Sequence, residues 1–152
     1  RVTQPIWGWF GQTDQFAMDD PFEPRPGIGR MLHGTPGVLG LVGAREGISL
    51  SAAAGIVAIA AKGRQLTRFG IELADEIGLA TNTPRDDRRG GHVSILHPDA
   101  TRLQAELAAH KVIVDKREPD VLRLGMSPLT TRFTDVFDAL ILLADLAANN
   151  AV

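Results

Sequence analysis

Apolar residues recur at helical spacing in the middle of the chain, between Gly55 and Gly78. Intervals of three and four residues put them on one face of a helix. These positions are Leu66, Phe69, Leu73 and Ile77. Gly55 interrupts the chain before this segment, and a glycine such as Gly78 commonly follows the last turn of a helix. We therefore expect a helix that ends at about Ile77 and buries one side.

Another helix is predicted just upstream, from Pro36 to about Ala53. Thr35 suits the N-cap position, and Pro36 suits the first helical position. The apolar stripe of this segment comprises Val38, Leu41, Val42 and Ile48. Glycines lower helix propensity, so four of them in one helix indicate close packing against another element. They are Gly37, Gly40, Gly43 and Gly47.

The pattern after Gly78 changes to short strands. We expect strands at 79–83, 92–96, 112–115 and 121–124. In the second of them, Val93 and Ile95 lie on one face because side chains alternate along a strand. The segment 84–91 is expected to be a charged turn, and its last part, Arg88-Arg89-Gly90-Gly91, is expected to be solvated.

Two helices are predicted among these strands. One opens at Pro98, runs to His110 and turns Leu103 and Leu107 inward, and the other is capped by Thr134. The apolar face of the last helix comprises Val136, Phe137, Leu140, Ile141, Leu143 and Ala144. This order of elements predicts a small α+β unit, in which helices cover one face of a largely antiparallel sheet.

The composition supports a folded core and excludes several classes of function. The chain has 152 residues, of which 44% are apolar, and its net charge of −2 offers no electrostatic footprint for nucleic acid. It contains no cysteine for disulfide or thiolate chemistry, and the spacing of its four histidines fits no metal site. The longest apolar run, residues 52–61, has about half the length that a membrane-spanning helix needs. Because the chain begins with Arg1, we expect a piece of a longer protein.

Two glycine-containing motifs near the start of the chain are candidate ligand-binding elements. Gly8-Trp9-Phe10-Gly11 sets two aromatic side chains between glycines, and Gly34-Thr35 precedes the predicted helix. The first N–H groups of a helix attract anions, so Thr35 could help to bind a phosphate, or it could simply cap the helix. Trp9 could stack on a flat ligand and donate its indole N–H, or it could anchor the loop, as we expect of Trp7.

Arg123 is a third candidate, in a segment that reads as a strand. Alternation puts it on the face opposite Leu122 and Leu124. A guanidinium on such a face pairs well with a carboxylate, which could belong to a substrate. The alternatives are a structural ion pair, with Asp120 or Asp115, and a strand edge that is open to water.

Short motifs in order along almost the whole chain resemble the C-terminal part of kynureninase, a pyridoxal 5'-phosphate (PLP) enzyme. Each motif is weak alone, but their common order makes the resemblance specific. They are Gly8-Trp9-Phe10-Gly11, Gln15-Phe16-Ala17-Met18, Gly34-Thr35-Pro36, Thr83-Pro84-Arg85, Arg88-Arg89-Gly90-Gly91-His92-Val93-Ser94, Arg117-Glu118-Pro119-Asp120, Leu122-Arg123, Pro128-Leu129 and Thr131-Arg132-Phe133.

The resemblance implies the α/β architecture of fold-type I, aspartate-aminotransferase-like PLP enzymes. It implies that residues 1–50 are the tail of the large PLP-binding domain and that residues 51–152 form the small C-terminal domain. It further implies a cytoplasmic homodimer with a shared active site, which acts in tryptophan catabolism. Such an enzyme hydrolyses L-kynurenine, or 3-hydroxykynurenine, to anthranilate, or its hydroxy form, and L-alanine.

The same resemblance assigns roles to five residues of this chain. Trp9 and Thr35 would contact the phosphate of the cofactor held by the other subunit. Arg123 would hold the α-carboxylate of the substrate. Phe10 and Gly34 would line the pocket around the aromatic amino ketone. For Thr35, Trp9 and Arg123, these roles agree with what the local sequence suggests.

Four positions depart from the pattern of the family. Gln12 replaces a common histidine, Leu124 and Met126 replace phenylalanines, and Thr130 replaces a tyrosine. These changes leave the aryl specificity open, as well as a related fold-type I enzyme such as an aminotransferase or a cysteine desulfurase. Outside the enzymes, the alternative is a non-catalytic domain that binds anions or a partner.

The lysine that binds the cofactor covalently has no counterpart here. Lys62, Lys111 and Lys116 are the only lysines, and none has the flanking residues of the family's lysine. A PLP enzyme needs that lysine, so no catalytic residue is assigned to this chain. We expect the chain alone to be inactive.

Overall fold

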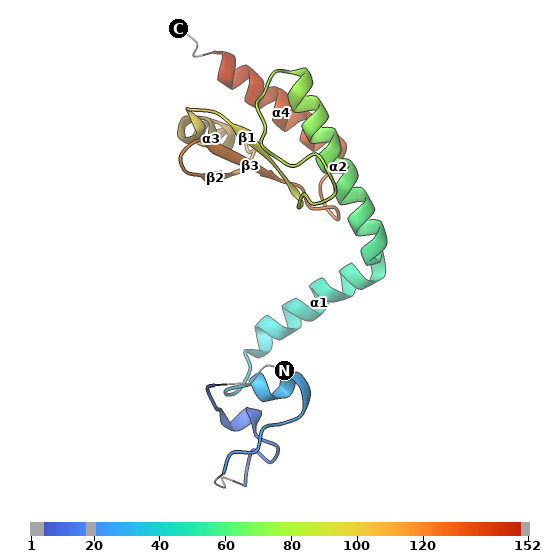
Figure 1. Ribbon diagram of the computed structural model, residues 1–152, viewed down its shortest axis with the longest axis vertical. Helices are drawn as coiled ribbons and strands as arrows, with labels where there is room; N and C mark the ends of the chain where they lie inside the picture. The colour runs from blue at the N-terminus through green and yellow to red at the C-terminus, as the bar shows by residue number, and fades with distance from the viewer. Residues whose placement is uncertain (1–4, 18–20, 150–152) are drawn as a thin grey trace. The chain divides into compact units, whose positions relative to one another are not determined.

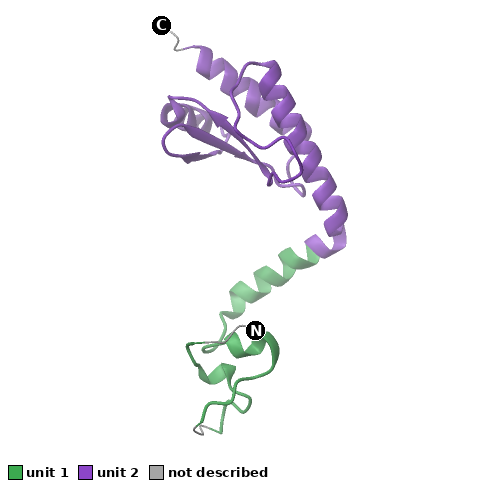
Figure 2. Cartoon of the chain, in the orientation of Figure 1, with its two compact units in different colours: residues 1–50 green, residues 51–152 purple. Residues whose placement is uncertain are grey.

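The computed structural model describes residues 5–17 and 21–149, and it divides into two compact units, residues 1–50 and 51–152 (Figure 2). The first unit holds two short 3-10 turns, η1 (Trp9–Gly11) and η2 (Gly27–Met31), and most of helix α1 (Val38–Ala54). In the described segments no single helix is long and apolar enough to cross a membrane. The bent pair of α1 and α2 (Ile56–Glu76) has the length and composition of a membrane span only when the two helices are taken together.

The first unit begins with a loop that its own backbone holds together. The N–H of Thr13 donates to the carbonyl of Glu23, and the N–H of Arg25 donates to the carbonyl of Gly11, both at 2.8 Å. A side chain at Gly8 would place its Cβ 2.0 Å from the carbonyl oxygen of His33. Only glycine allows this approach of the two backbones, so main-chain contacts hold the loop at the start of the first unit together.

Helix α1 begins two residues later than the predicted start at Pro36. The carbonyl of Gly37 accepts the N–H of Leu41 at 3.0 Å, which makes Gly37 the residue that opens the helix. Thr35 therefore lies outside the N-cap position, and the predicted cap is wrong. No residue of α1 is buried, and the Cβ positions of its predicted packing glycines meet nothing within 4 Å. The packing partner that they indicate is not among the described residues.

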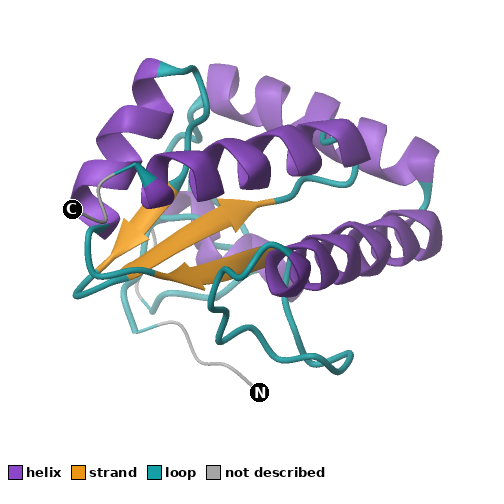
Figure 3. Ribbon diagram, turned by 90° about the horizontal axis from the view of Figure 1, so that it is seen from above, coloured by secondary structure: helices purple, strands orange, loops and turns teal. Residues whose placement is uncertain are grey.

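The second unit is a three-stranded antiparallel sheet with helices over one face (Figures 1 and 3). Its strands β1 (His92–Leu96), β3 (Val121–Gly125) and β2 (Asp115–Arg117) lie side by side in that order. The helices are α2, α3 (Ala100–Ala109) and α4 (Phe133–Ala148). Fully buried side chains from both layers form the core: Leu66, Val93, Ile95, Leu103, Leu107, Leu122, Leu140 and Leu143. The predicted α+β architecture is confirmed.

Two helices of this unit end in the same motif. After α2, Gly78 has a φ of 77°, and the N–H of Leu79 reaches back to the carbonyl of Ala74 at 2.8 Å. After α3, Lys111 has a φ of 65°, and the N–H of Val112 donates to the carbonyl of Leu107 at 2.9 Å. These backward bonds satisfy carbonyls at the helix ends.

The hydrogen bond that ends α3 also displaces the strand predicted at 112–115. The N–H of Val112 belongs to the end of α3, and the carbonyl of Val114 accepts the side-chain amide of Gln104 at 3.0 Å. The strand starts only at Asp115, where the backbone is free to pair with β3.

The predicted strand at 79–83 is also wrong, because its contacts to β1 are mostly made by side chains and only the Ala80 carbonyl accepts a backbone N–H, that of Leu96 at 2.8 Å. The Thr81 hydroxyl donates to the carbonyl of Ser94 at 2.7 Å, and the Thr83 hydroxyl accepts the N–H of Ser94 at 2.8 Å. Only Thr81 makes an isolated bridge, opposite Ile95. The segment follows β1 without becoming a fourth strand.

The final helix has a different cap from the predicted one. Arg132, and not Thr134, is the N-cap of α4. The Asp135 carboxylate accepts the backbone N–H of Arg132 at 2.8 Å and its guanidinium at 2.6 and 3.0 Å. These hydrogen bonds hold the pKa of Asp135 below its ordinary value of 3.8.

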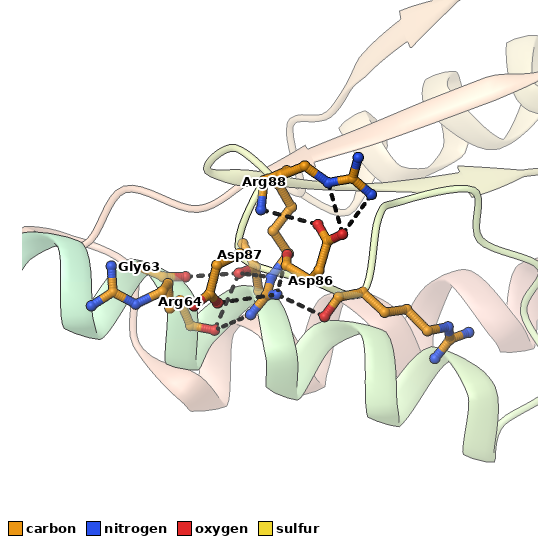
Figure 4. A network of polar contacts seen from close by, with 8 residues as sticks. Gly63, Arg64, Asp86, Asp87 and Arg88 are labelled. Atoms are coloured by element: carbon orange, nitrogen blue, oxygen red, sulfur yellow. Dashed lines mark hydrogen bonds and ion pairs between the residues drawn. The ribbon is translucent and has the colours of Figure 1, made fainter.

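Arg89 corrects the prediction of a solvated turn at 88–91. Its side chain is only 2% exposed. Figure 4 shows the polar network of this turn, with Arg64, Asp86 and Arg88 among the labelled residues. Its guanidinium donates to the Thr67 hydroxyl at 2.9 Å and to the carbonyls of Arg64, Arg85 and Asp86 at 2.8–3.1 Å. Arg89 thus fastens the turn to α2, whereas Arg88 stays exposed and pairs with Asp86.

We predict that Arg89→Met lowers the free energy of unfolding by about 1–3 kcal/mol, because it removes the hydrogen bonds of a side chain that is only 2% exposed, including the bond to the buried Thr67 hydroxyl. Arg88→Met is the matched control, since the Arg88 side chain is 86% exposed, and its effect should stay within about 0.5 kcal/mol. Urea unfolding of the chain measures both. Equal effects of the two substitutions would contradict the structural role of Arg89.

A second prediction concerns the stability of the chain at low pH. The lowered pKa of Asp135 means that its contribution to stability is complete above pH 3.8 and is lost as the pH falls through the lower, folded-state pKa. Asp135→Asn should therefore unfold at a lower temperature than the parent chain at neutral pH, and the two midpoints should converge in acid. A difference that persists unchanged well below pH 3.8 would show that the charge of Asp135 is not responsible.

Candidate functional site

The first unit carries a cluster of aromatic side chains around Trp9. The Trp9 ring meets Phe10 edge-on, with centroids 4.5 Å apart, and Phe16 in the same manner at 5.9 Å. Trp9 remains 47% exposed, so one part of its surface is open to a ligand. Trp7 instead stacks flat on Phe22, with centroids 5.0 Å apart, and it is 66% exposed, so it is not the buried anchor that the sequence suggested.

Gly34 lies beside the indole nitrogen of Trp9. A Cβ built on Gly34 would be 3.9 Å from Trp9 Nε1, so the backbone at Gly34 and the indole N–H border the same space. The structure therefore brings together three of the residues singled out in the sequence, Trp9, Phe10 and Gly34.

Thr35 follows directly and is exposed, three residues before the first residue of α1. Within residues 5–17 and 21–149, neither the Thr35 hydroxyl nor the Trp9 indole N–H has a hydrogen-bond partner of its own. The first N–H groups of α1 come next in the chain, and such groups attract anions. This set of donors suits a phosphate.

Arg123 belongs to the second unit and lies on the face of the sheet away from the core. Its neighbours in sequence, Leu122 and Leu124, face the helices and are 0% and 6% exposed. Its Nε donates to Asp115 Oδ2 at 2.8 Å, and its Nη2 donates to the same oxygen. Arg117 Nη2 lies 3.2 Å from that oxygen as well. Of the alternatives that the sequence left open, the structure contains the ion pair with Asp115.

The groups around Asp115 stabilise the negative charge of its carboxylate. The hydrogen bond from Arg123 and the nearby positive charges of Arg117 and Arg123 hold the pKa of its carboxyl below the ordinary 3.8. Arg117 was missed in the sequence, although alternation along Asp115-Lys116-Arg117 puts the first and third side chains on one face.

An open hollow of about 690 Å³ lies next to this cluster. Its lining residues are Gly91, His92, Gln104, Ile113, Val114, Asp115, Arg123 and Gly125. The Arg123 side chain is 31% exposed, so a small anion can reach it. Within the described residues, no three or more His, Asp or Glu side chains gather into a metal site.

Two of the departures from the family pattern lie in the core. Leu124 and Met126 are 6% and 4% exposed, and the Met126 Cε lies 2.8 Å from the position of a Cβ on Gly70. They pack the sheet against the helices. Thr130 is exposed and borders a smaller hollow of about 220 Å³ between β3 and α4. Gln12 lies in the first unit, where its backbone bridges to Pro24.

Comparison with solved structures shows the fold. Apo cysteine desulfurase from Thermococcus onnurineus NA1 matches 95% of this chain and 39% of its own, with a TM-score of 0.75 and 21% identity. A NifS-like protein matches 86% of this chain and 40% of its own, with a TM-score of 0.65 and 18% identity. This chain therefore shares the fold of these two proteins, in agreement with the fold-type I architecture that the sequence predicted.

Sequence comparison is more specific. The kynureninase C-terminal domain matches residues 59–143. Kynureninase from Pseudomonas fluorescens is 38% identical over 95% of this chain, and kynureninase from Burkholderia mallei (strain SAVP1) is 38% identical over 97% of it. The chain spans 36–37% of the length of these relatives. On this evidence, the chain belongs to the kynureninase family.

Proposed function

We propose that this chain is the C-terminal part of a PLP-dependent hydrolase that converts L-kynurenine, or 3-hydroxykynurenine, to anthranilate, or its hydroxy form, and L-alanine. The observation that carries the proposal is the 38% identity to kynureninase over 95% of the chain. In this proposal, residues 1–50 complete the large domain and residues 51–152 are the small domain. The whole enzyme is a cytoplasmic homodimer with a shared active site.

The donors beside Gly34 support the proposed cofactor site. Trp9 offers an indole N–H and Thr35 offers a hydroxyl, and neither is used by the described part of the chain. Both can donate to phosphate oxygens, and the missing side chain of Gly34 lets a ligand approach the backbone. The cofactor would supply the electron sink for the bond cleavage, and these residues would orient it.

Arg123 is proposed to bind the α-carboxylate of the substrate. A guanidinium that is partly exposed, beside an open hollow and on a rigid strand, fits this task. Phe10 and Gly34 are proposed to line the pocket for the aryl group, since Phe10 packs against Trp9 next to the proposed phosphate site.

None of the three lysines of this sequence is placed here as the lysine that holds the cofactor. Lys116 Nζ donates to the Thr101 hydroxyl at 2.7 Å and pairs with Glu118 at 2.6 Å. Lys111 ends α3 with a positive φ, and Lys62 lies within α2. The proposal therefore takes the lysine that holds the cofactor from a part of the enzyme outside this sequence.

The first test is the activity of the full-length enzyme that contains this chain. It should release L-alanine and anthranilate from L-kynurenine, while the 152-residue chain with added PLP should release neither. L-cysteine is the comparison substrate, because cysteine desulfurase shares the fold. Alanine formed from L-cysteine and not from L-kynurenine would overturn the proposal, as would turnover of L-kynurenine by the chain alone.

A further prediction addresses the phosphate donors. In the full-length enzyme, Trp9→Phe and Thr35→Val should each weaken PLP binding about tenfold or more, because each removes one hydrogen bond to a charged group. Titration of the apoenzyme, followed by the absorbance of PLP, measures the change. Trp7→Phe is the matched control, since Trp7 stacks on Phe22, and it should bind PLP like the parent enzyme. Unchanged affinity in both Trp9→Phe and Thr35→Val would remove these residues from the site.

A further inference from the structure

The contacts of Arg123 leave one side of its guanidinium unused. Nε and Nη2 both donate to Asp115, whereas Nη1 has no partner within residues 5–17 and 21–149. A guanidinium can meet a carboxylate along two edges, the side edge of Nε and Nη2 and the end edge of Nη1 and Nη2. Asp115 takes the side edge, and the end edge is left for a second carboxylate.

The register of the hairpin fixes this arrangement. Asp115 of β2 lies directly opposite Arg123 of β3, so the two side chains stand on the same face of the sheet. Both residues line the open hollow of about 690 Å³. An arginine side chain has many rotamers, and the ion pair to Asp115 restricts them to those that keep Arg123 beside this hollow.

Arg117 makes the net charge of the cluster around Asp115 positive. It contacts the same oxygen of Asp115 as Arg123 does, so the cluster holds one carboxylate between two guanidinium groups. Two positive charges and one negative charge leave a net charge of +1. Asp115 can therefore orient Arg123 without cancelling the attraction for an anionic ligand.

Two other charged side chains of the hairpin, Lys116 and Glu118, pair with each other and not with the cluster. Lys116 points to the opposite face, where it pairs with Glu118 and donates to Thr101. Its side chain is 15% exposed, whereas that of Glu118 is 79% exposed. Glu118 thus offers a control carboxylate in the same hairpin that has no contact with Arg123 or Arg117.

We propose that Asp115 is a positioning residue, which holds Arg123 by its side edge so that its end edge receives the α-carboxylate of the substrate, while Arg117 balances the charge of Asp115. This inference rests on the proposed function of Arg123. It makes substrate affinity depend on an acidic residue that itself touches no substrate.

The test uses the full-length enzyme and two ligands that differ only in the carboxylate. These are L-kynurenine and kynuramine, the corresponding amine without the α-carboxylate, which is measured as a competitive inhibitor. Asp115→Asn should raise the KM for L-kynurenine about tenfold, with kcat nearly unchanged and with the inhibition constant of kynuramine unchanged. Glu118→Gln should leave all three quantities as they are in the parent enzyme.

Two further variants separate the possible failures. Arg123→Gln should raise the KM for L-kynurenine at least as much as Asp115→Asn does. If Arg123→Gln has no such effect, the proposed role of Arg123 is wrong and the inference falls with it. If Arg123→Gln raises KM and Asp115→Asn does not, only the positioning role of Asp115 is overturned.

A merely structural role of Asp115 gives a different result. It would weaken the binding of L-kynurenine and kynuramine alike, and that outcome would also overturn the inference. Asp115→Glu keeps the charge but moves it by one methylene, and it covers the case in which Asp115→Asn does not fold. Its KM for L-kynurenine should rise less than that of Asp115→Asn, again with unchanged inhibition by kynuramine.

Discussion

The burial of one face of a three-stranded sheet against α2, α3 and α4 determines most of what the second unit presents to its surroundings. Leu122 and Leu124 must face the helices, and strand alternation then sends Arg123 to the other face. The antiparallel register adds Asp115 opposite it. The polar cluster is thus a direct consequence of core packing, because a shift of one residue would bury Arg123 and expose two leucines.

The first unit is built in another way. It has few buried side chains among those described, and close approaches between backbones hold its loop together, as at Gly8 and His33. Most of its described apolar side chains are exposed, among them Leu39 at 89% and Ile28 at 85%. A segment of this kind places Trp9 and Gly34 by main-chain geometry, whereas Arg123 is placed by a hydrophobic core.

Elements with a clear apolar period could be predicted closely from the sequence. The strand at 92–96 has the predicted bounds, and α2 buries the expected face. The errors come from side chains that replace backbone partners, such as Thr81 and Thr83, and from Lys111, a non-glycine residue with positive φ that ends a helix. Arg89 looked solvated because its neighbours are charged, and only the tertiary fold brings it to its acceptors on α2, the Thr67 hydroxyl and the Arg64 carbonyl. At the candidate site, the pairing of Arg123 with Asp115 follows from the register, while the role of Arg117 needs the contact itself.

The hydroxyl groups of Thr81 and Thr83 have one more consequence, for the way this sheet meets other proteins. They occupy the N–H and the carbonyl of Ser94, which an additional strand would otherwise use. On the far side of the sheet, β2 is only three residues long and carries Lys116 and Arg117. Short, charged or covered edges resist pairing between molecules. Both edges of the sheet therefore disfavour pairing with a strand of another molecule, and this lowers the tendency of the second unit to aggregate edge to edge.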